Sequence, residues 1–290
     1  MSSSDSHLVL RNDHDGVSTL AFNRPDALNA LSPSLFSELE VHLTDLAKSP
    51  DKIGVVVLTG RGRSFSAGND LKAIERGEHA SRPHQQAELL DFIETMPQPV
   101  IASVRGHCYT GALELAIAFD LLICADDAKF CDTHGKWGMV PTWGMTNRLP
   151  ERVGPIAARD MMFSGRMVTG VEAVQMGLAN RSVSSDDLET ATAEWAATIA
   201  ANSWHTLREE KRQMRQLLSL DRHEGLKWAR EHGPGPAPDM IERIQEGCKR
   251  CYGPSRYIKE QRCLKSLSST THIEAHLRTP WRSPRKRTLT

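Results

Sequence analysis

Long apolar stretches are absent from this sequence of 290 residues, and none approaches the roughly 18 to 20 apolar residues that a membrane-spanning helix needs. The start, MSSSDSHLVL, lacks a basic region followed by an apolar stretch, and no arginine precedes Arg11. Neither a secretion signal nor a mitochondrial presequence is therefore expected. The predicted location is the cytoplasm. The peroxisome stays an alternative, although the chain ends in Thr288-Leu289-Thr290 instead of an SKL-type address.

The sequence also lacks an excess of charge of either sign. Lys plus Arg and Asp plus Glu number 36 each, so net charge gives no reason to expect a nucleic-acid or membrane partner. The balance is uneven, because residues 252–290 carry nine basic and two acidic side chains. We expect this segment to be a disordered, solvated tail. A basic arm that holds an anionic partner is the alternative.

Cysteine is sparse, and its six positions are scattered. This usage indicates a reducing compartment and not a disulfide framework. Cys108, Cys124 and Cys131 lie in apolar segments, which predicts buried core thiols. Cys248 and Cys251 form a single CxxC pair, but the second pair that makes a zinc pattern specific is missing. No metal is expected.

Several catalytic and cofactor motifs are missing. The sequence has no GxxxxGK[ST] loop for nucleotide phosphates, no GxGxxG that opens a helix after a strand, and no HExxH for zinc. It also has no GxSxG elbow, which excludes a serine hydrolase of the α/β type. No bound cofactor is expected.

Strand and helix patterns alternate along the first half of the chain. Residues 7–23 predict two strands joined by a hairpin turn at 13–16, and Ser32 opens an amphipathic helix that ends near Ser49. Residues 53–59 are continuously apolar, as in a parallel strand that is covered on both faces. The further expected elements are a helix at 84–95, a strand at 100–104, a helix at 111–119, and short strands in LLICAD and AKFCDT. This alternation predicts an α/β core.

The part after Pro155 is almost entirely helical in pattern. The expected helices are 171–176, 188–201 and 207–218. The sequence thus predicts a core over residues 1–200, a C-terminal helical region over 201–251, and the basic tail over 252–290.

Two glycine-containing segments each connect an expected strand to a helical stretch. They are RSFSAGNDL at residues 63–71 and RGHCYTGALELA at 105–116. Glycine at either turn alone is more often needed only for a positive φ. The pair is more informative, because Gly111 lies where a helix begins and Glu114 lies about one turn along it. Backbone NH groups at the two turns therefore predict an oxyanion site beside a carboxylate.

These segments resemble the crotonase (enoyl-CoA hydratase/isomerase) superfamily from residue 23 to about residue 250. The blocks that carry the resemblance are NRPDALNAL, SFSAGNDLK, GHCYTGALELA, DLLICADDAKF, GMVPTWGMTNRLPERVG and SGRMVTGVEAVQMGLANRSV. The resemblance implies an α/β fold of repeated ββα units in a spiral sheet core with a C-terminal helical trimerisation region. It also implies acyl-CoA substrates, so that CoA belongs to the substrate, and a homotrimer or a dimer of trimers.

The resemblance assigns roles residue by residue. The NH groups of Asn69 and Gly111 fall on the oxyanion donors, and Glu114 falls on the first catalytic glutamate. The substrate-binding positions are Ala67, Gly68, Asp70, Leu71 and Lys72, with Lys72 near the CoA phosphates; a surface lysine after a turn is the alternative.

The sequence departs from the family at the second catalytic glutamate, where it has His134. A histidine gives or accepts a proton near neutral pH, so we expect His134 to share the acid–base work with Glu114. A pocket-lining histidine without proton transfer is the alternative. Asp132, two residues earlier on the expected strand, would lie on the same face and orient the imidazole, and it is also the alternative second acid.

Aromatic residues near these segments are candidates for the pocket. Trp137 and Trp143 are expected to shape the acyl site, and His107 and Tyr109 flank the second turn. Plain packing is the alternative for the two tryptophans. His107 and Tyr109 are expected either to bound the acyl end of the pocket or to supply a further proton donor.

The predicted function is the addition of water to a 2-enoyl-CoA by a hydro-lyase. Because His134 replaces a carboxylate, three other reactions of the superfamily stay open: double-bond isomerisation, thioester hydrolysis and diketone cleavage. The alternative outside the enzymes is a non-catalytic scaffold protein that keeps the same fold.

Overall fold

A computed structural model describes residues 7–247 of the chain, so the CxxC pair and the predicted tail lie outside the described residues. The chain forms two compact units, residues 1–235 and residues 236–290. Every helix and strand named below belongs to the first unit. No helix among the described residues is both long and apolar enough to cross a membrane.

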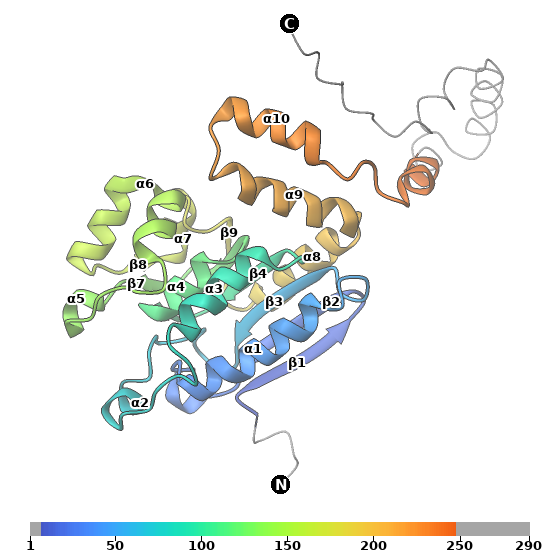
Figure 1. Cartoon of the computed structure of the whole chain (residues 1–290). Coiled ribbons are helices and arrows are strands. Elements are labelled where there is room, and N and C mark those ends of the chain that lie inside the picture. Colours follow the sequence, from blue (N-terminus) through green and yellow to red (C-terminus); the bar gives the residue numbers. More distant parts are fainter. Residues whose placement is uncertain (1–6, 248–290) are drawn as a thin grey trace, which may run out of the picture. The chain divides into compact units, whose positions relative to one another are not determined.

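A six-stranded sheet forms the centre of the first unit (Figure 1). Its strands, in spatial order, are β1 (Val9–His14), β2 (Val17–Phe22), β3 (Val55–Gly60), β4 (Val100–Val104), β6 (Leu121–Ala125) and β9 (Arg181–Val183). Only the β1–β2 pair is antiparallel, and the other four pairs are parallel. The β1–β2 connection is the predicted hairpin, with Asp15 (φ 47°) and Gly16 (φ 77°) in its turn.

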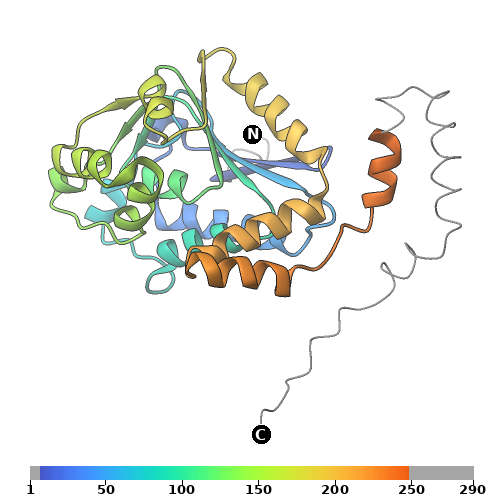
Figure 2. The ribbon, with the colours of Figure 1, turned by 90° about the horizontal axis from the view of Figure 1, so that it is seen from above.

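Helices cover both faces of this sheet. Helix α1 (Pro33–Ala47) and helix α3 (Gln85–Thr95) lie on one face, and α8 (Leu188–Ala200) lies on the other (Figure 2). The α1 helix begins where predicted, because the Ser32 side chain accepts a hydrogen bond from the Leu35 NH at 3.2 Å. Its buried side is made by residues spaced three and four apart: Leu35, Phe36, Leu39, Leu43 and Leu46.

A smaller sheet lies beside the first, with β5 (His107–Tyr109), β7 (Lys129–Cys131) and β8 (Val168–Thr169) in that order. Four helices follow or adjoin these strands: α4 (Gly111–Ile117), α5 (His134–Trp137), α6 (Met145–Ser164) and α7 (Gly170–Gln175). The α6 helix is interrupted at Gly154 (φ 78°, ψ 159°), directly before Pro155. A proline ring disfavours helical geometry in the residue before it, which explains the break.

The remaining elements are α2 (Leu71–Glu75), a short 3-10 helix (Pro25–Ala27), α9 (Trp204–Leu217) and α10 (Arg222–His232). The predicted α/β class is confirmed, and so are the helices at the expected positions in the last third. The C-terminal trimerisation region stays a prediction. So does the division at residue 200, which falls between α8 and α9 inside the first unit.

One local expectation is wrong. The strand expected in AKFCDT ends at Cys131, and His134 is the first residue of helix α5. Strand alternation therefore does not bring Asp132 and His134 together. Their contact arises in the turn between β7 and α5, where the His134 NH donates to the Asp132 carboxylate at 2.9 Å.

Candidate active site

The two glycine-containing segments run side by side and parallel. The Phe65 NH donates to the Arg105 carbonyl at 2.7 Å, and the Ser66 NH donates to the His107 carbonyl at 2.9 Å. A bridge between Ser66 and Cys108 continues this pairing. Because the two segments run in the same direction, their ends arrive at the same place, and that place holds the two turns singled out in the sequence.

Glycine is needed at both turns for reasons of space. Gly68 has φ +94°, and a Cβ there would approach the Tyr109 carbonyl oxygen at 2.6 Å. A Cβ at Gly111 would collide with the Asn69 amide oxygen and with the Trp143 ring. The residues on either side of the predicted oxyanion site are thus in direct contact.

The two predicted oxyanion donors have no competing acceptors. Among the residues that the structure describes, neither the Asn69 NH nor the Gly111 NH has a hydrogen-bond partner. Gly111 is the first residue of α4, where an NH has no partner within the helix. On the first turn, the Gly68 carbonyl and the Asp70 NH are both bonded to Leu31, at 2.8 and 3.1 Å, which holds the residue between them in place.

Glu114 is buried, with 1% of its surface exposed, and it lies on the first turn of α4. Its Oε1 accepts hydrogen bonds from the Trp143 NH at 3.0 Å and the Met145 NH at 3.1 Å. Its Oε2 lies 3.4 Å from Nε2 of His134. One carboxylate oxygen is thus held by the backbone, and the other faces the imidazole.

The imidazole of His134 lies between two carboxylates. Nδ1 is 2.6 Å from Oδ1 of Asp132, and Nε2 faces Glu114. Burial alone lowers the pKa of a histidine, but the hydrogen bonds and charges of Asp132 and Glu114 outweigh it and raise the pKa of His134 to about 9. His134 is therefore an imidazolium at neutral pH, a proton donor that faces Glu114.

Asp70 has structural partners for both of its carboxylate oxygens. Oδ1 accepts from the Ala73 NH at 3.1 Å and caps α2, and Oδ2 pairs with Arg24 at 2.8 Å. Burial raises the pKa of this carboxyl, but the Arg24 hydrogen bond and the capping NH together bring it below its usual value. The Asp70 side chain thus ties the first turn to the 3-10 helix region, which the sequence did not reveal.

The other expected substrate-binding residues divide by exposure. Leu71 and Lys72 are exposed on α2, whereas Ala67 is half-buried and donates its NH to the Leu28 carbonyl at 2.9 Å. Trp137 is 60% exposed at the end of α5. Tyr109 packs edge-on against His107, with ring centroids 5.0 Å apart.

Trp143 is closer to the reacting groups than the sequence suggested. Its backbone NH holds Glu114, and its ring lies against Gly111 and meets Phe36 at 5.1 Å between centroids. Trp143 therefore contributes to the site through both its backbone and its ring.

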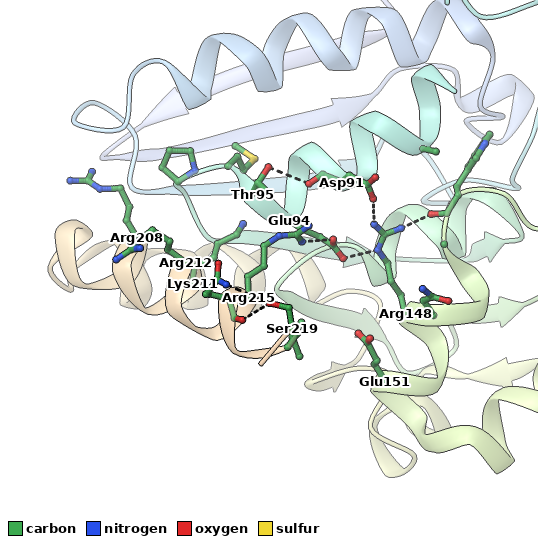
Figure 3. Close-up of a pocket in the computed structure, with 18 of the residues that line it drawn as sticks. Asp91, Glu94, Thr95, Arg148, Glu151, Arg208, Lys211, Arg212, Arg215 and Ser219 are labelled. Carbon is green, nitrogen blue, oxygen red and sulfur yellow. Dashed lines mark hydrogen bonds and ion pairs between the residues drawn. The ribbon is translucent and has the colours of Figure 1, made fainter. Parts of the chain in front are cut away.

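A cavity of about 1000 Å³ lies between α3, α6 and α9, and Trp143 and Gly144 contribute to its wall (Figure 3). Half of its other lining residues are charged. Glu114 and His134 do not line it.

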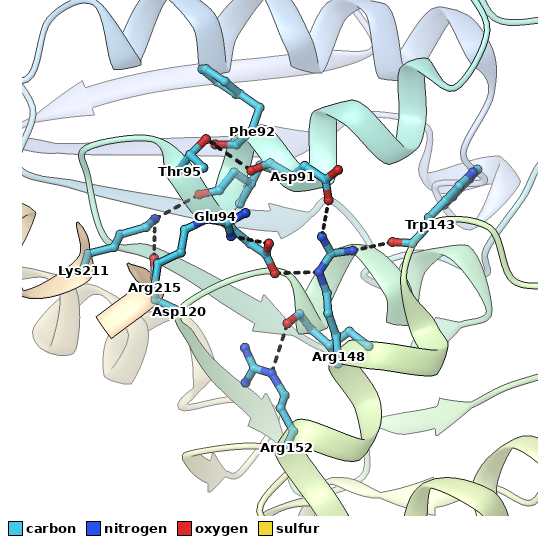
Figure 4. A network of polar contacts seen from close by, with 12 residues as sticks. Asp91, Phe92, Glu94, Thr95, Asp120, Trp143, Arg148, Arg152, Lys211 and Arg215 are labelled. Carbon is cyan, nitrogen blue, oxygen red and sulfur yellow. Dashed lines mark hydrogen bonds and ion pairs between the residues drawn. The ribbon is translucent and has the colours of Figure 1, made fainter. Parts of the chain in front are cut away.

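Arg148 links this cavity wall to Trp143 (Figure 4), whose backbone NH holds Glu114. The guanidinium donates to Asp91 and Glu94 of α3, each at 2.6 Å, and to the Trp143 carbonyl at 2.5 Å. Glu94 also pairs with Arg215 of α9. The sequence did not point to this arginine, because its partners on α3 are 54 and 57 residues away.

No group of three or more His, Cys, Asp or Glu side chains within residues 7–247 is arranged to hold a metal ion. The absence of a metal and of a bound cofactor stays a prediction for the whole chain.

The sequence profile of the enoyl-CoA hydratase/isomerase family matches residues 12–232. The chain belongs to this family. A probable enoyl-CoA hydratase of Mycobacterium tuberculosis is 36% identical over 229 residues, which cover 77% of this chain and 86% of the relative. A carnitinyl-CoA dehydratase of Proteus mirabilis is 33% identical over 227 residues, with 77% and 85% covered.

Solved structures of family members have the same fold. An enoyl-CoA hydratase from Bacillus anthracis superposes with a TM-score of 0.78 at 29% identity and covers 84% of this chain and 97% of its own. An enoyl-CoA hydratase from Mycobacterium tuberculosis gives a TM-score of 0.66 at 35% identity, with 76% and 94% covered. The crotonase fold inferred from the sequence is thus confirmed.

Proposed function

We propose that the protein adds water to the double bond of a 2-enoyl-CoA thioester. One observation carries this proposal: two unpaired NH groups, of Asn69 and Gly111, belong to adjoining turns, and Glu114, on the same first turn of α4 as Gly111, faces His134 with Oε2 and Nε2 3.4 Å apart. The names of the relatives, which include hydratases and a dehydratase acting on CoA esters, support the same reaction class.

The two NH groups would bind the thioester oxygen. As water attacks C3, electrons move from the double bond onto this oxygen and form an enolate. A preorganised donor in a site shielded from bulk solvent contributes about 3 kcal/mol to the stabilisation of such a charge, because it needs no reorganisation during the reaction. Leu71 and Lys72 on exposed α2 would flank the CoA portion, with the Lys72 ammonium near its phosphates.

Glu114 and His134 would share the proton transfers. Glu114 takes a proton from the attacking water, whose oxygen forms the new bond to C3. The His134 imidazolium then gives its proton to C2 of the enolate, which restores the thioester carbonyl. The proton on Glu114 passes back across 3.4 Å to His134, so both groups return to their starting states.

Double-bond isomerisation is the second candidate. It needs one group that takes a proton from one carbon and returns it to another, and the presence of an imidazole in place of a second carboxylate favours it. The oxyanion donors serve the same role in both reactions, because both pass through an enolate. We also propose a homotrimer or dimer of trimers, by analogy with the family, and a cytoplasmic location, with the peroxisome as the alternative.

The test is a spectrophotometric assay with crotonyl-CoA and longer 2-enoyl-CoA esters. We expect the enoyl absorbance to fall with wild type, and Glu114→Gln and His134→Gln to lose activity by about 10² or more. Glu194→Gln and His223→Gln, at exposed positions outside the site, are matched controls and should keep wild-type rates. A wild type that consumes no enoyl ester but isomerises a 3-enoyl ester would replace hydration with the second candidate.

A further inference from the structure

The residue before the Gly111 donor has an unusual backbone. Thr110 has φ 52° and ψ −112°. Two other non-glycine residues with positive φ are ordinary by comparison, since Leu28 and His84 have ψ 35° and 13° in the left-handed helical region. Thr110 lies outside that region, in a conformation normally left to glycine, and threonine is β-branched. Such an outlier persists only when its surroundings hold it.

Thr110 is held on all sides. It is 3% exposed, its NH donates to the Cys131 carbonyl at 2.9 Å, and its carbonyl accepts from the Glu114 NH at 2.9 Å. Its hydroxyl accepts from the Thr133 NH at 3.2 Å and forms a second hydrogen bond with the Thr133 hydroxyl. The Thr110 hydroxyl therefore bonds both the backbone NH and the side-chain hydroxyl of Thr133.

These contacts join the two halves of the proposed site. The peptide plane between residues 110 and 111 carries the Gly111 NH, and because a peptide is planar, ψ of Thr110 sets where that NH points. Thr133 lies between Asp132 and His134 in the turn that holds the imidazole. One hydroxyl thus connects the oxyanion turn to the loop of the proton donor.

We propose that Thr110 is a positioning residue whose hydroxyl, through Thr133, keeps the Gly111 NH and the His134 imidazole at a fixed spacing. This inference rests on the proposed function, because it assumes that both groups act on one substrate. The alternative is that the Thr110 hydroxyl only satisfies the polar groups of Thr133. Loss of the hydroxyl would then lower the stability of the protein without a specific loss of turnover.

Three variants separate these readings. Thr110→Val removes the hydroxyl and keeps the shape and β-branching, and Thr110→Ser keeps the hydroxyl. Thr192→Val is a matched control: Thr192 is also buried, and its hydroxyl pairs with the Ser103 hydroxyl at 2.9 Å and donates to the Leu188 carbonyl, on α8 away from the site. The hydroxyls at positions 110 and 192 thus have similar partners in different places.

We expect Thr110→Val to lower kcat about tenfold with KM changed less than twofold, because the enolate forms only during the reaction. Thr110→Ser should stay within about twofold of wild type. Thr192→Val should lower the thermal midpoint without this fall in kcat. The proposal is wrong if Thr110→Val turns over like wild type, if its kcat falls no further than that of Thr192→Val, or if Thr110→Ser loses as much as Thr110→Val.

A second measurement does not depend on turnover. Acetoacetyl-CoA binds to an oxyanion site as its enolate, which absorbs in the near ultraviolet, so a difference spectrum reports the donors directly. We expect the band with wild type and Thr110→Ser and about a tenfold weaker affinity of the enolate for Thr110→Val. If wild type shows the band but hydrates nothing, the hydratase proposal fails and the Thr110 comparison still decides this one. If wild type shows no band, Gly111 is not a donor and the Thr110 proposal is overturned.

Discussion

At the scale of single residues, the charge on His134 determines what the site does at a given pH. The imidazole is buried and faces a carboxylate at each nitrogen. A protonated ring that faces Glu114 is suited to give a proton, and it loses this ability as the pH rises past its pKa.

Asp132→Asn should move the basic limb of the pH–rate profile. In wild type, Asp132 and Glu114 overcome the effect of burial and raise the pKa of His134 to about 9, so kcat should fall as the pH rises through that value. The asparagine removes the charge and most of the stabilisation of the imidazolium, which lowers the pKa of His134. We expect the basic limb to shift downward by at least about one pH unit, measured as kcat between pH 6 and 10. A basic limb that stays in place would exclude His134 as the proton donor.

The sequence predicted that Glu114 and His134 share a site, and the structure brings their side chains to 3.4 Å. The family resemblance was enough for this, because it places the second acid–base residue at position 134. Asp132 was expected to orient the His134 imidazole, and the two side chains are in contact. The bond from the Trp143 NH to Glu114 and the Arg24–Asp70 pair on the first turn were not predictable, because these partners are 29 and 46 residues apart. Contacts of this kind depend on how the elements pack, which no local pattern records.

At the scale of elements, the loop before α6 carries part of the site. The NH groups of Trp143 and Met145 hold Glu114, and Arg148 holds the Trp143 carbonyl against α3. A Cβ at Gly144, which has φ +105°, would collide with the Arg148 guanidinium. The position of the Arg148 side chain therefore requires glycine at residue 144 of this loop.

Arg148→Lys should reduce both stability and turnover, because an ammonium cannot reach Asp91, Glu94 and the Trp143 carbonyl together. We expect a loss of about 1–3 kcal/mol in the free energy of unfolding and about a tenfold lower kcat as Glu114 loosens. Arg152→Lys is the matched control, one turn further along α6, where Arg152 bonds the Ile117 and Phe119 carbonyls at the far end of α4. Denaturant titration and the enoyl-CoA assay measure the two effects. An equal fall in kcat for Arg148→Lys and Arg152→Lys would contradict the prediction that Arg148 acts on turnover through the loop that holds Glu114.

Strongly periodic elements were predictable, and short or interrupted ones were not. The β4 strand has the predicted bounds, and α3 differs from prediction by one residue. The α5 helix has four residues, too few for a period to show, and the sequence predicts its first residue, His134, as the continuation of a strand. The α6 helix was not predicted, because it contains Pro150 and Pro155 and a proline in the sequence usually marks the end of a helix.

At the scale of the whole molecule, the buried imidazole should make stability depend on pH. The pKa of His134 is about 9 in the folded protein and about 6.5 in an unfolded chain. Its contribution to stability is therefore fully present below pH 6.5 and is lost as the pH rises to about 9.

We expect the stability advantage of wild type over His134→Gln to shrink between pH 6.5 and 9, by at most about 3 kcal/mol. Denaturant unfolding at several pH values measures it. Exposed His223 provides the control, since His223→Gln should show no such trend. An advantage that is constant over this range would mean that the imidazole is neutral in the folded protein.

The proposed oxyanion donors at Asn69 and Gly111 are atoms of the main chain. Among residue replacements, only proline deletes a backbone NH. Random mutation can therefore rarely abolish this part of the chemistry directly, and it must act by bending the chain instead. Related sequences can therefore differ at residue 69 while its amide hydrogen stays in place, whereas residue 111 is restricted to glycine, because a Cβ there would collide with Asn69 and Trp143. An alignment column at residue 69 then reports which side chain the turn tolerates and not what the position does.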